Sequence, residues 1–211
     1  MLQIDGLQHF EYRSCYYDDD NICYFDHHSG KRKRFKVRTR HYVDSDEHWF
    51  EVKLKGNNGE TKKSRLKCEK FMYQNVAGGL RRHLELNFQK NYKISFNYQL
   101  TPSLVVSYRR STLVCNSKQE RVTIDTDLQF YDPRNSEASF KLNSAMAIVE
   151  IKSDGKRGNL EDFLFLAGCR QEEKLSKYCL GVASLNPSIR RNNFLPILKK
   201  LEKQGFVTRT W

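Results

Sequence analysis

Residues 31–55, KRKRFKVRTRHYVDSDEHWFEVKLK, decide the fold. Cations alternate with apolar or β-branched residues along the first half of this stretch. The cations are Arg34, Lys36, Arg38 and Arg40, and the residues between them are Phe35, Val37 and Thr39. Successive side chains on a strand point to opposite faces, so the four cations share one face. Glu51, Lys53 and Lys55 alternate with Phe50, Val52 and Leu54 in the same way. The pattern predicts two strands joined by an acidic turn at residues 44–47.

Two adjacent cationic strands repel each other unless an anion lies between them. Such alternation is also typical of an antiparallel sheet with one solvated face. The same pattern recurs on later strands of the chain, which favours a bound anion over a merely solvated face. We therefore expect a negatively charged ligand.

Size and charge limit the class of protein. The chain has 211 residues, which suits one domain, and its 12% aromatic content argues against disorder. The formal net charge is +12, with a pI of about 9.4. This balance indicates a polyanionic partner: nucleic acid, a phosphate polymer, a nucleotide or an anionic membrane surface.

Six cysteines are present, and none forms a CxxC pair or has a histidine at zinc-ligand spacing. We expect reduced thiols in a cytoplasmic protein. The sequence shows no apolar run of membrane-spanning length and no signal peptide at its start.

The remaining pattern predicts one α+β domain, an antiparallel tunnel or barrel with flanking helices. Strands are expected within 12–26 and at 61–67, 104–114, 120–128 and 145–152, with a loop at 27–30 and a break in the sheet at 131–134. Helices are expected at 79–91, outside the sheet, and at 159–173 and 193–204. On strand 145–152, we expect Ala147, Val149 and Ile151 to face the core and Glu150 and Lys152 to face the cations.

The polar strand positions form the candidate site. They are Arg34, Lys36, Arg38, Arg40, Lys53, Lys55, Lys63, Arg110, Arg121, Glu150 and Lys152. Buried like charges cost several kcal/mol each unless paired, so a barrel lined by them needs phosphate or carboxylate groups inside. Arginine suits phosphate oxygens and lysine supplies a point charge. Glu150 suits a divalent metal on those oxygens.

An ordered series of motifs carries a family resemblance. The motifs are Tyr24-Phe25-Asp26, Arg38-Thr39-Arg40-His41-Tyr42, Glu51-Val52-Lys53, Lys63-Ser64-Arg65, Tyr108-Arg109-Arg110-Ser111, Arg121-Val122-Thr123-Ile124-Asp125, Val149-Glu150-Ile151-Lys152 and Ser176-Lys177-Tyr178. Over residues 12–183 the chain resembles the VTC domain, the polyphosphate polymerase domain of the CYTH-like triphosphate tunnel metalloenzymes. Each motif alone is weak, but eight in the right order are specific.

The resemblance implies an antiparallel tunnel in which the terminal phosphate of a nucleoside triphosphate is transferred to polyphosphate, with Mn²⁺ or Mg²⁺. ATP and polyphosphate would be the partners. By motif, the phosphates would be bound by Arg38, Arg40, Lys53, Lys63, Tyr108, Arg110, Arg121, Ser176 and Lys177. Arg38, Arg40, Lys53, Arg110 and Arg121 would also be catalytic, and Glu150 would hold the metal. Residues 1–211 would form one such domain, without the strand and helix that usually open the family.

Three alternatives remain. A tunnel triphosphatase usually carries an ExExK motif on its first strand, which this sequence lacks. A non-catalytic sensor of polyphosphate or inositol phosphates would keep the cations without needing Glu150. A nucleic-acid-binding sheet would place aromatic residues beside the cations, but Phe35 and Phe50 alternate with them, so no nucleic-acid partner is expected.

Overall fold

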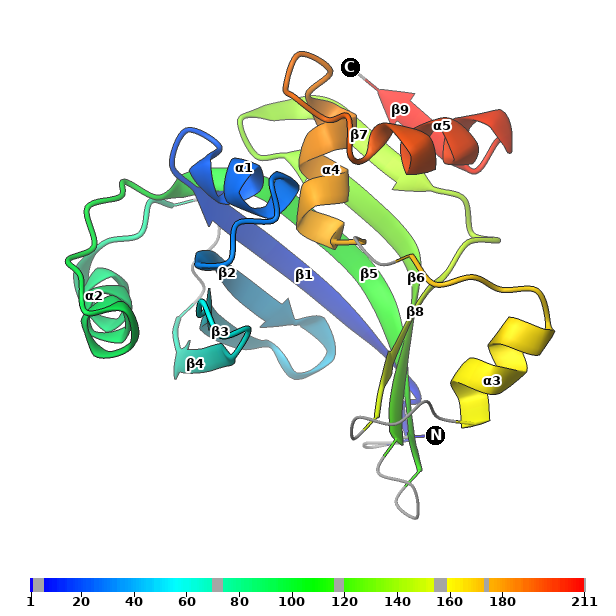
Figure 1. Ribbon diagram of the computed structural model, residues 1–211, viewed down its shortest axis with the longest axis horizontal. Coiled ribbons are helices and arrows are strands. Elements are labelled where there is room, and N and C mark those ends of the chain that lie inside the picture. Colours follow the sequence, from blue (N-terminus) through cyan, green and yellow to red (C-terminus); the bar gives the residue numbers. More distant parts are fainter. Residues whose placement is uncertain (2–5, 70–73, 116–119, 154–158, 173–174, 211) are drawn as a thin grey trace.

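The computed structural model describes residues 1, 6–69, 74–115, 120–153, 159–172 and 175–210. One antiparallel sheet runs through them (Figure 1). Its strands are β1 (His9–Asp18), β2 (Arg34–Tyr42), β3 (Glu47–Lys55), β4 (Thr61–Lys67), β5 (Thr101–Cys115), β6 (Glu120–Asp132), β7 (Asn135–Leu142), β8 (Ile148–Lys152) and β9 (Val207–Thr210). The strand order is β4-β3-β2-β1-β5-β6-β7-β9, and β8 pairs with β6. The predicted α+β class and antiparallel pairing are confirmed.

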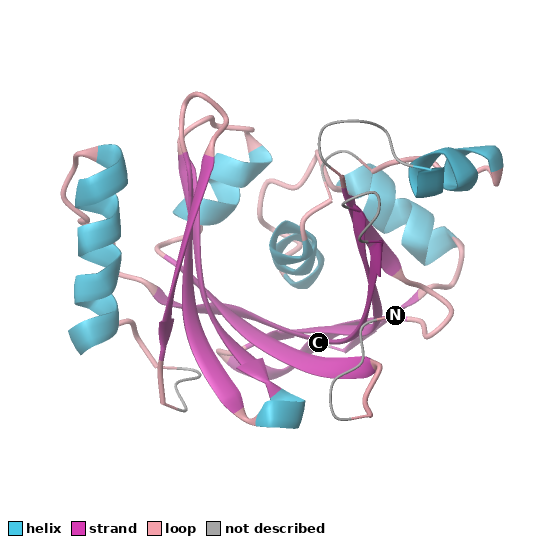
Figure 2. Ribbon diagram, turned by 90° about the horizontal axis from the view of Figure 1, so that it is seen from below, coloured by secondary structure: helices cyan, strands magenta, loops and turns pink. Residues whose placement is uncertain are grey.

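The sheet is strongly curved and forms an open, tunnel-like trough (Figure 2). β7 and β8 pair with successive parts of β6. Within the described residues β4 and β9 end the strand order without pairing with each other, so the sheet does not close. The trough has a concave and a convex face, and alternate residues of each strand supply them.

Five helices flank the sheet in the part of the chain that the structure describes. They are α1 (Ile22–His28), α2 (Gly78–Tyr92), α3 (Asn159–Leu166), α4 (Lys177–Leu185) and α5 (Leu195–Lys203). α2 lies outside the trough, as expected, whereas α4 lies within its curve (Figure 2). None of these helices combines the length and apolarity needed to cross a membrane.

The convex face of β2 and β3 forms an apolar core with α2. Phe35 and Val37 on β2 and Phe50 on β3 are fully buried. The ring of Phe88 on α2 packs edge-on against Phe35, with centroids 5.0 Å apart. Burying a side chain of this size contributes about 2 kcal/mol. The alternate residues of these strands are therefore the ones left to face the concave side.

α4 packs closely against the concave face. A Cβ atom on Gly181 would lie 2.6 Å from side-chain carbons of both Leu104 and Phe130, so glycine permits the close approach. The ring of Tyr178 stacks on Tyr16 of β1, with centroids 5.1 Å apart. The helix thereby fills one end of the trough and leaves its first residues at the edge of the open part.

The strand-like piece and loop predicted over residues 21–30 are wrong, because α1 occupies residues 22–28. Asp18, 2% exposed, accepts hydrogen bonds from the backbone amides of Cys23 (2.8 Å) and Tyr24 (3.0 Å). It also accepts one from the Tyr178 hydroxyl. A buried carboxylate on β1 thus holds the first amides of a helix that local pattern did not indicate.

Other expectations need correction. The break at residues 131–134 is a turn between β6 and β7, and β7, α4 and β9 were not predicted. Val149 is 44% exposed and does not face the core. α3 ends at Leu166, and much of its expected apolar stripe is exposed, with Phe163 at 64% and Leu166 at 84%.

Candidate functional site: the basic trough

Strand register gathers the predicted cations on the concave face. Directly paired residues of an antiparallel sheet point to the same side. Arg38 pairs with Tyr16 and Glu51, and Arg40 pairs with Ser14 and Trp49. The next positions along carry Lys36, Lys53 and Lys63 side by side on β2, β3 and β4.

The same face continues through the other half of the sheet. The pair Tyr12–Tyr108 joins the two halves, and these rings stack with centroids 5.3 Å apart. Beyond it, Arg110 on β5 pairs with Asp125 on β6. Further along β6, Thr123 pairs with Glu150 and Arg121 with Lys152. The predicted residues of β2 to β6 and β8 therefore share one surface, which we call the basic trough.

One carboxylate bridges the cations at the centre of β2. Arg38 Nε donates to Glu51 at 2.7 Å, and Arg40 Nη1 lies 3.7 Å from the other Glu51 oxygen. Burial alone would raise the pKa of Glu51, but Arg38 and Arg40 hold it below the usual value. Burial would likewise lower the pKa of Arg38, yet Tyr16 and Glu51 raise it. The Arg38 guanidinium therefore stays charged.

A second carboxylate ties the sheet to α4. Asp125, fully buried, accepts hydrogen bonds from Arg110 Nε at 2.6 Å and Nη2 at 2.8 Å. Lys177 Nζ, at the start of α4, lies 2.5 Å from the same carboxylate. Burial would raise the pKa of Asp125, but the two cations lower it. Asp125 therefore holds one cation from the sheet, Arg110, and one from α4, Lys177, at the same place.

Glu150 lies beside this trio. Its side chain is 47% exposed and forms an ion pair of 3.1 Å with Lys152. Burial would raise its pKa, but Lys152, Lys177 and Arg110 together lower it. The hydroxyl of Thr123, its cross-strand neighbour, is buried without a hydrogen-bond partner among the described residues. An ionised carboxylate next to an unsatisfied hydroxyl fits a divalent metal, which usually takes one or two carboxylates and completes its shell with phosphate and water.

One end of the trough opens into a cavity of about 710 Å³. Its wall includes Arg34, Lys36, Lys53 and Lys55, and none of the described residues that line it is a carboxylate. Lys36 Nζ donates to the Ser176 hydroxyl at 2.9 Å, and Ser176 also caps α4. Burial, Lys36 and Lys63 lower the pKa of Lys53. Its ammonium is thus held among like charges, in a space suited to an anion.

Buried polar atoms at the centre of the trough lack partners. Arg40 Nε and the Ser14 hydroxyl, which lie on paired residues, have no hydrogen bond within the described chain. An unmet buried donor costs about 1–3 kcal/mol. Burial would raise the pKa of Tyr16 nearby, but Arg38, Lys36 and Arg40 lower it. The positive charge of these surroundings thus outweighs the effect of burial on this phenol, so an anion is the ligand that they favour.

Most predicted site residues lie together. The group comprises Arg38, Arg40, Lys53, Lys63, Tyr108, Arg110, Glu150, Ser176 and Lys177. Arg121 shares the face but is exposed at the outer end of β6, opposite Lys152. Sequence reasoning assigned no role to Glu51, Asp125 or Ser14. Glu51 and Asp125 lie an even number of residues from cations on their own strands, so they point to the same face as those cations. This alternation is the sequence signal that could have found them.

Comparison with known proteins identifies the family of the chain. A scan of protein-family models matches residues 3–186 to the VTC domain. A search of the curated proteins finds no match. Among solved structures, the PH1819 protein from Pyrococcus horikoshii OT3 is similar, with 12% identity, a TM-score of 0.44, and coverage of 82% of this chain and 84% of that one. The family match spans most of the chain and indicates a polyphosphate-related function. The chain belongs to the VTC domain family.

Proposed function

We propose that the basic trough binds a linear chain of phosphates and transfers the terminal phosphate of a nucleoside triphosphate to polyphosphate. The observation that carries the proposal is the pair Arg40 and Ser14. Their buried donors lack partners at the centre of a cationic surface, and phosphate oxygens would satisfy both. A polymer of repeating anions also suits a trough that presents cations on successive strands.

The residues of the trough divide the task of holding the phosphates. Arg38 and Arg40 would bind the middle of the chain, and Lys36 and Lys53 would draw one end towards the cavity. Arg110 and Lys177 would hold the reacting phosphate, because Asp125 fixes both side chains from behind. Phosphoryl transfer asks the protein mainly for alignment and for neutralisation of charge, and both are available here.

Glu150 would hold Mn²⁺ or Mg²⁺, with the Thr123 hydroxyl beside it. The ion would neutralise charge on the phosphate oxygens. To bind it, the carboxylate would leave Lys152, and that lysine would then be free to contact a phosphate.

A non-catalytic polyphosphate-binding module is the second candidate. The Glu150–Lys152 ion pair favours it, because this pair occupies the carboxylate within the protein itself. Binding would then rely on the cations alone, with no need for a metal.

The test separates binding from turnover. Purified protein is incubated with ATP and Mn²⁺, and the products are resolved on a polyphosphate gel, while calorimetry follows the binding of tripolyphosphate without metal. We expect polymer from the wild type. Glu150→Gln should bind tripolyphosphate at least as tightly, because one repulsive carboxylate is gone, and should make no polymer. Arg40→Gln should lose at least tenfold in affinity. Lys62→Gln, on an exposed part of β4, is the matched control and should behave as wild type.

The alternatives predict other outcomes. Tight binding of tripolyphosphate with no product under any metal would support the binding module. Release of inorganic phosphate without polymer would indicate a triphosphatase. Unchanged Mn²⁺-dependent synthesis by Glu150→Gln would rule out Glu150 as the metal ligand.

A further inference from the structure

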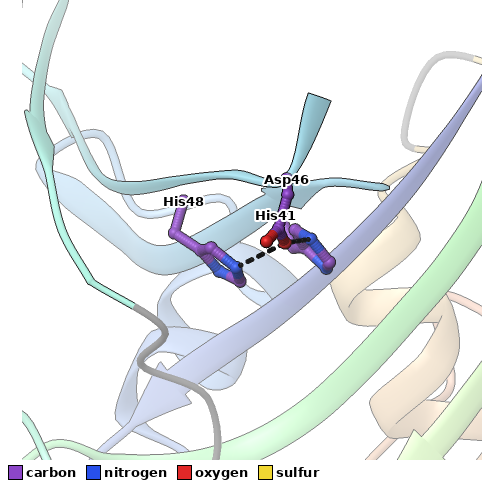
Figure 3. A group of neighbouring side chains, drawn as sticks. All are labelled: His41, Asp46 and His48. Atoms are coloured by element: carbon purple, nitrogen blue, oxygen red, sulfur yellow. Dashed lines mark hydrogen bonds and ion pairs between the residues drawn. The ribbon is translucent and has the colours of Figure 1, made fainter. Parts of the chain in front are cut away.

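A second cluster of ligating side chains lies on the opposite side of the sheet. His41 near the end of β2 pairs directly with His48 near the start of β3. Asp46, in the turn between them, points its carboxylate at both imidazoles (Figure 3). By strand alternation the histidines share the convex face with Thr39 and Phe50, whereas Arg40 faces the trough. The cluster is therefore separate from the basic trough.

The ligand atoms of this cluster lie close together. Asp46 Oδ1 is 2.8 Å from His41 Nε2 and 3.5 Å from His48 Nε2. All three ligand atoms lie within 4.8 Å of one another. The side chains of His41 and His48 are 17% and 6% exposed, whereas Asp46 is 85% exposed. Two sheltered nitrogens and one accessible oxygen leave a route for an ion from solvent.

We propose that His41, Asp46 and His48 bind a transition-metal ion of the Zn²⁺ class. Imidazole nitrogen and carboxylate oxygen are common zinc ligands, and three protein ligands leave a fourth position for water. Imidazole favours zinc, copper and nickel, whereas magnesium and calcium prefer oxygen ligands alone. The site would thus select a different ion from the one that Glu150 is expected to hold.

Binding requires a small rearrangement of the rings. The two imidazoles stack with centroids 4.0 Å apart and an interplanar angle of only 9°. An ion bound to imidazole lies close to the ring plane, and it cannot lie in two parallel planes at this separation. One ring therefore turns about its Cβ–Cγ bond when the ion binds. His41, the less buried of the two, is the ring with room to turn.

Position gives the site a structural role. The three ligands come from β2, β3 and the 3-10 turn Val43–Ser45 with its following residue, so one ion would fasten the end of this hairpin. The turn holds the backbone of Asp46 in the left-handed region, with φ of 48°. This conformation directs its side chain back towards the strands. On the other face of the same hairpin end lie Arg40 and its partner Trp49. A fastened hairpin would hold Arg40 more firmly in the trough.

The test uses the full chain, with any purification tag removed and with Cys169 replaced by serine to remove this exposed thiol. Zn²⁺ binding is measured by competition with a chromophoric chelator, and Co²⁺ binding by visible absorption. We expect one Zn²⁺ per chain, undisturbed by millimolar Mg²⁺. His41→Gln and Asp46→Gly should each weaken it at least tenfold; glycine also tolerates the positive φ. His9→Gln, at a histidine on β1 outside the cluster, is the matched control and should bind as wild type.

Two results would overturn the proposal. One is wild-type protein that binds no stoichiometric Zn²⁺. The other is equal affinity in the wild type, His41→Gln and Asp46→Gly, which would place the ion elsewhere. Circular dichroism spectra of each variant establish that the fold is retained, and Asp46→Gly is the variant least able to disturb it, because Asp46 is exposed.

Discussion

We expect Glu51 to stabilise the protein and to lower its affinity for anions. It neutralises Arg38 and Arg40, and its side chain is only 21% exposed. Glu51→Gln leaves two half-buried cations without a counter-charge, so we expect a loss of about 3 kcal/mol in the free energy of unfolding. Bound tripolyphosphate would replace the missing charge. Urea denaturation with and without tripolyphosphate should therefore show a larger ligand-induced gain in Glu51→Gln than in the wild type.

The matched control is Glu60→Gln in the β3–β4 hairpin, where Glu60 pairs with Lys62 in solvent. Solvent screens such pairs, so its denaturation midpoint should match the wild type. If tripolyphosphate stabilised Glu51→Gln no more than the wild type, Glu51 and the ligand would not share Arg38 and Arg40.

His27 makes the protein sensitive to acid. Its Nδ1 accepts a hydrogen bond from Arg34 Nε at 3.0 Å, and burial, Lys36 and Arg34 lower its pKa from 6.5 to about 3. Between these values the unfolded chain takes up a proton that the folded chain does not, so stability falls as the pH falls below 6.5. By pH 5 the loss is about 2 kcal/mol. We expect His27→Gln to remove this part of the pH profile, measured by urea denaturation from pH 7.5 to 4.5; identical profiles would contradict the assignment.

Strand parity made many of the individual site residues predictable. Alternation along residues 34–40 and 50–55 correctly placed the cations opposite Phe35 and Phe50. Parity does not show which cations are neutralised within the protein, because Glu51 and Asp125 become counter-ions only after the sheet pairs. The His41–His48 pair was not predicted for the same reason, because the two residues come together only when the turn pairs their strands.

The fit of α4 against the sheet determines where Lys177 and Ser176 lie. A methyl group at position 181 would press on Leu104 and Phe130. Gly181→Ala should cost about 1–3 kcal/mol through overpacking, although alanine favours helix. Displacing the helix would also shift Lys177 from Asp125 and weaken tripolyphosphate binding. Thermal unfolding and calorimetry together measure the two effects.

Gly79→Ala is the control, because Gly79 is also in a helix and a Cβ atom there meets nothing within 4 Å. It should be neutral or slightly stabilising. Equal stability of the two variants would show that α4 can shift away from the sheet at no cost.

Elements with a continuous local pattern were predictable, and elements that depend on distant partners were not. α2 and the strands β2 to β6 follow from alternation and helical spacing. α1 depends on the buried Asp18 carboxylate of β1. This carboxylate accepts hydrogen bonds from the backbone amides of Cys23 and Tyr24 and from the Tyr178 hydroxyl. β9 is short and pairs with β7, a strand 65 or more residues earlier in the chain. Short segments of this kind take their structure from tertiary contacts.

At the scale of the whole molecule, the curvature of the sheet converts an ordinary charged face into a binding surface. A flat sheet would expose these cations to water, where each would be solvated separately. Within the trough, the charge of Glu150 opposes the lowering of the Lys53 pKa, and the charge of Lys177 contributes to the lowering of the Glu150 pKa. Because α4 fills one end and the cavity of about 710 Å³ opens beside it, a bound chain of anions would run along the remaining length.

This arrangement predicts how the whole protein responds to polyanions. With a net charge of +12, the chain should bind any polyanion weakly, and added salt should weaken that attraction. Under the proposed function tripolyphosphate would also occupy the trough, so at a hundredfold excess over its dissociation constant it should stabilise the fold by about 2.7 kcal/mol, or roughly 5–10 °C in Tm. Sodium chloride at equal ionic strength should give little shift. We expect duplex DNA to be attracted through net charge alone, so its effect should disappear at about 0.2 M salt. Stronger protection by DNA than by tripolyphosphate would mean that an exposed surface, rather than the trough, binds the anion.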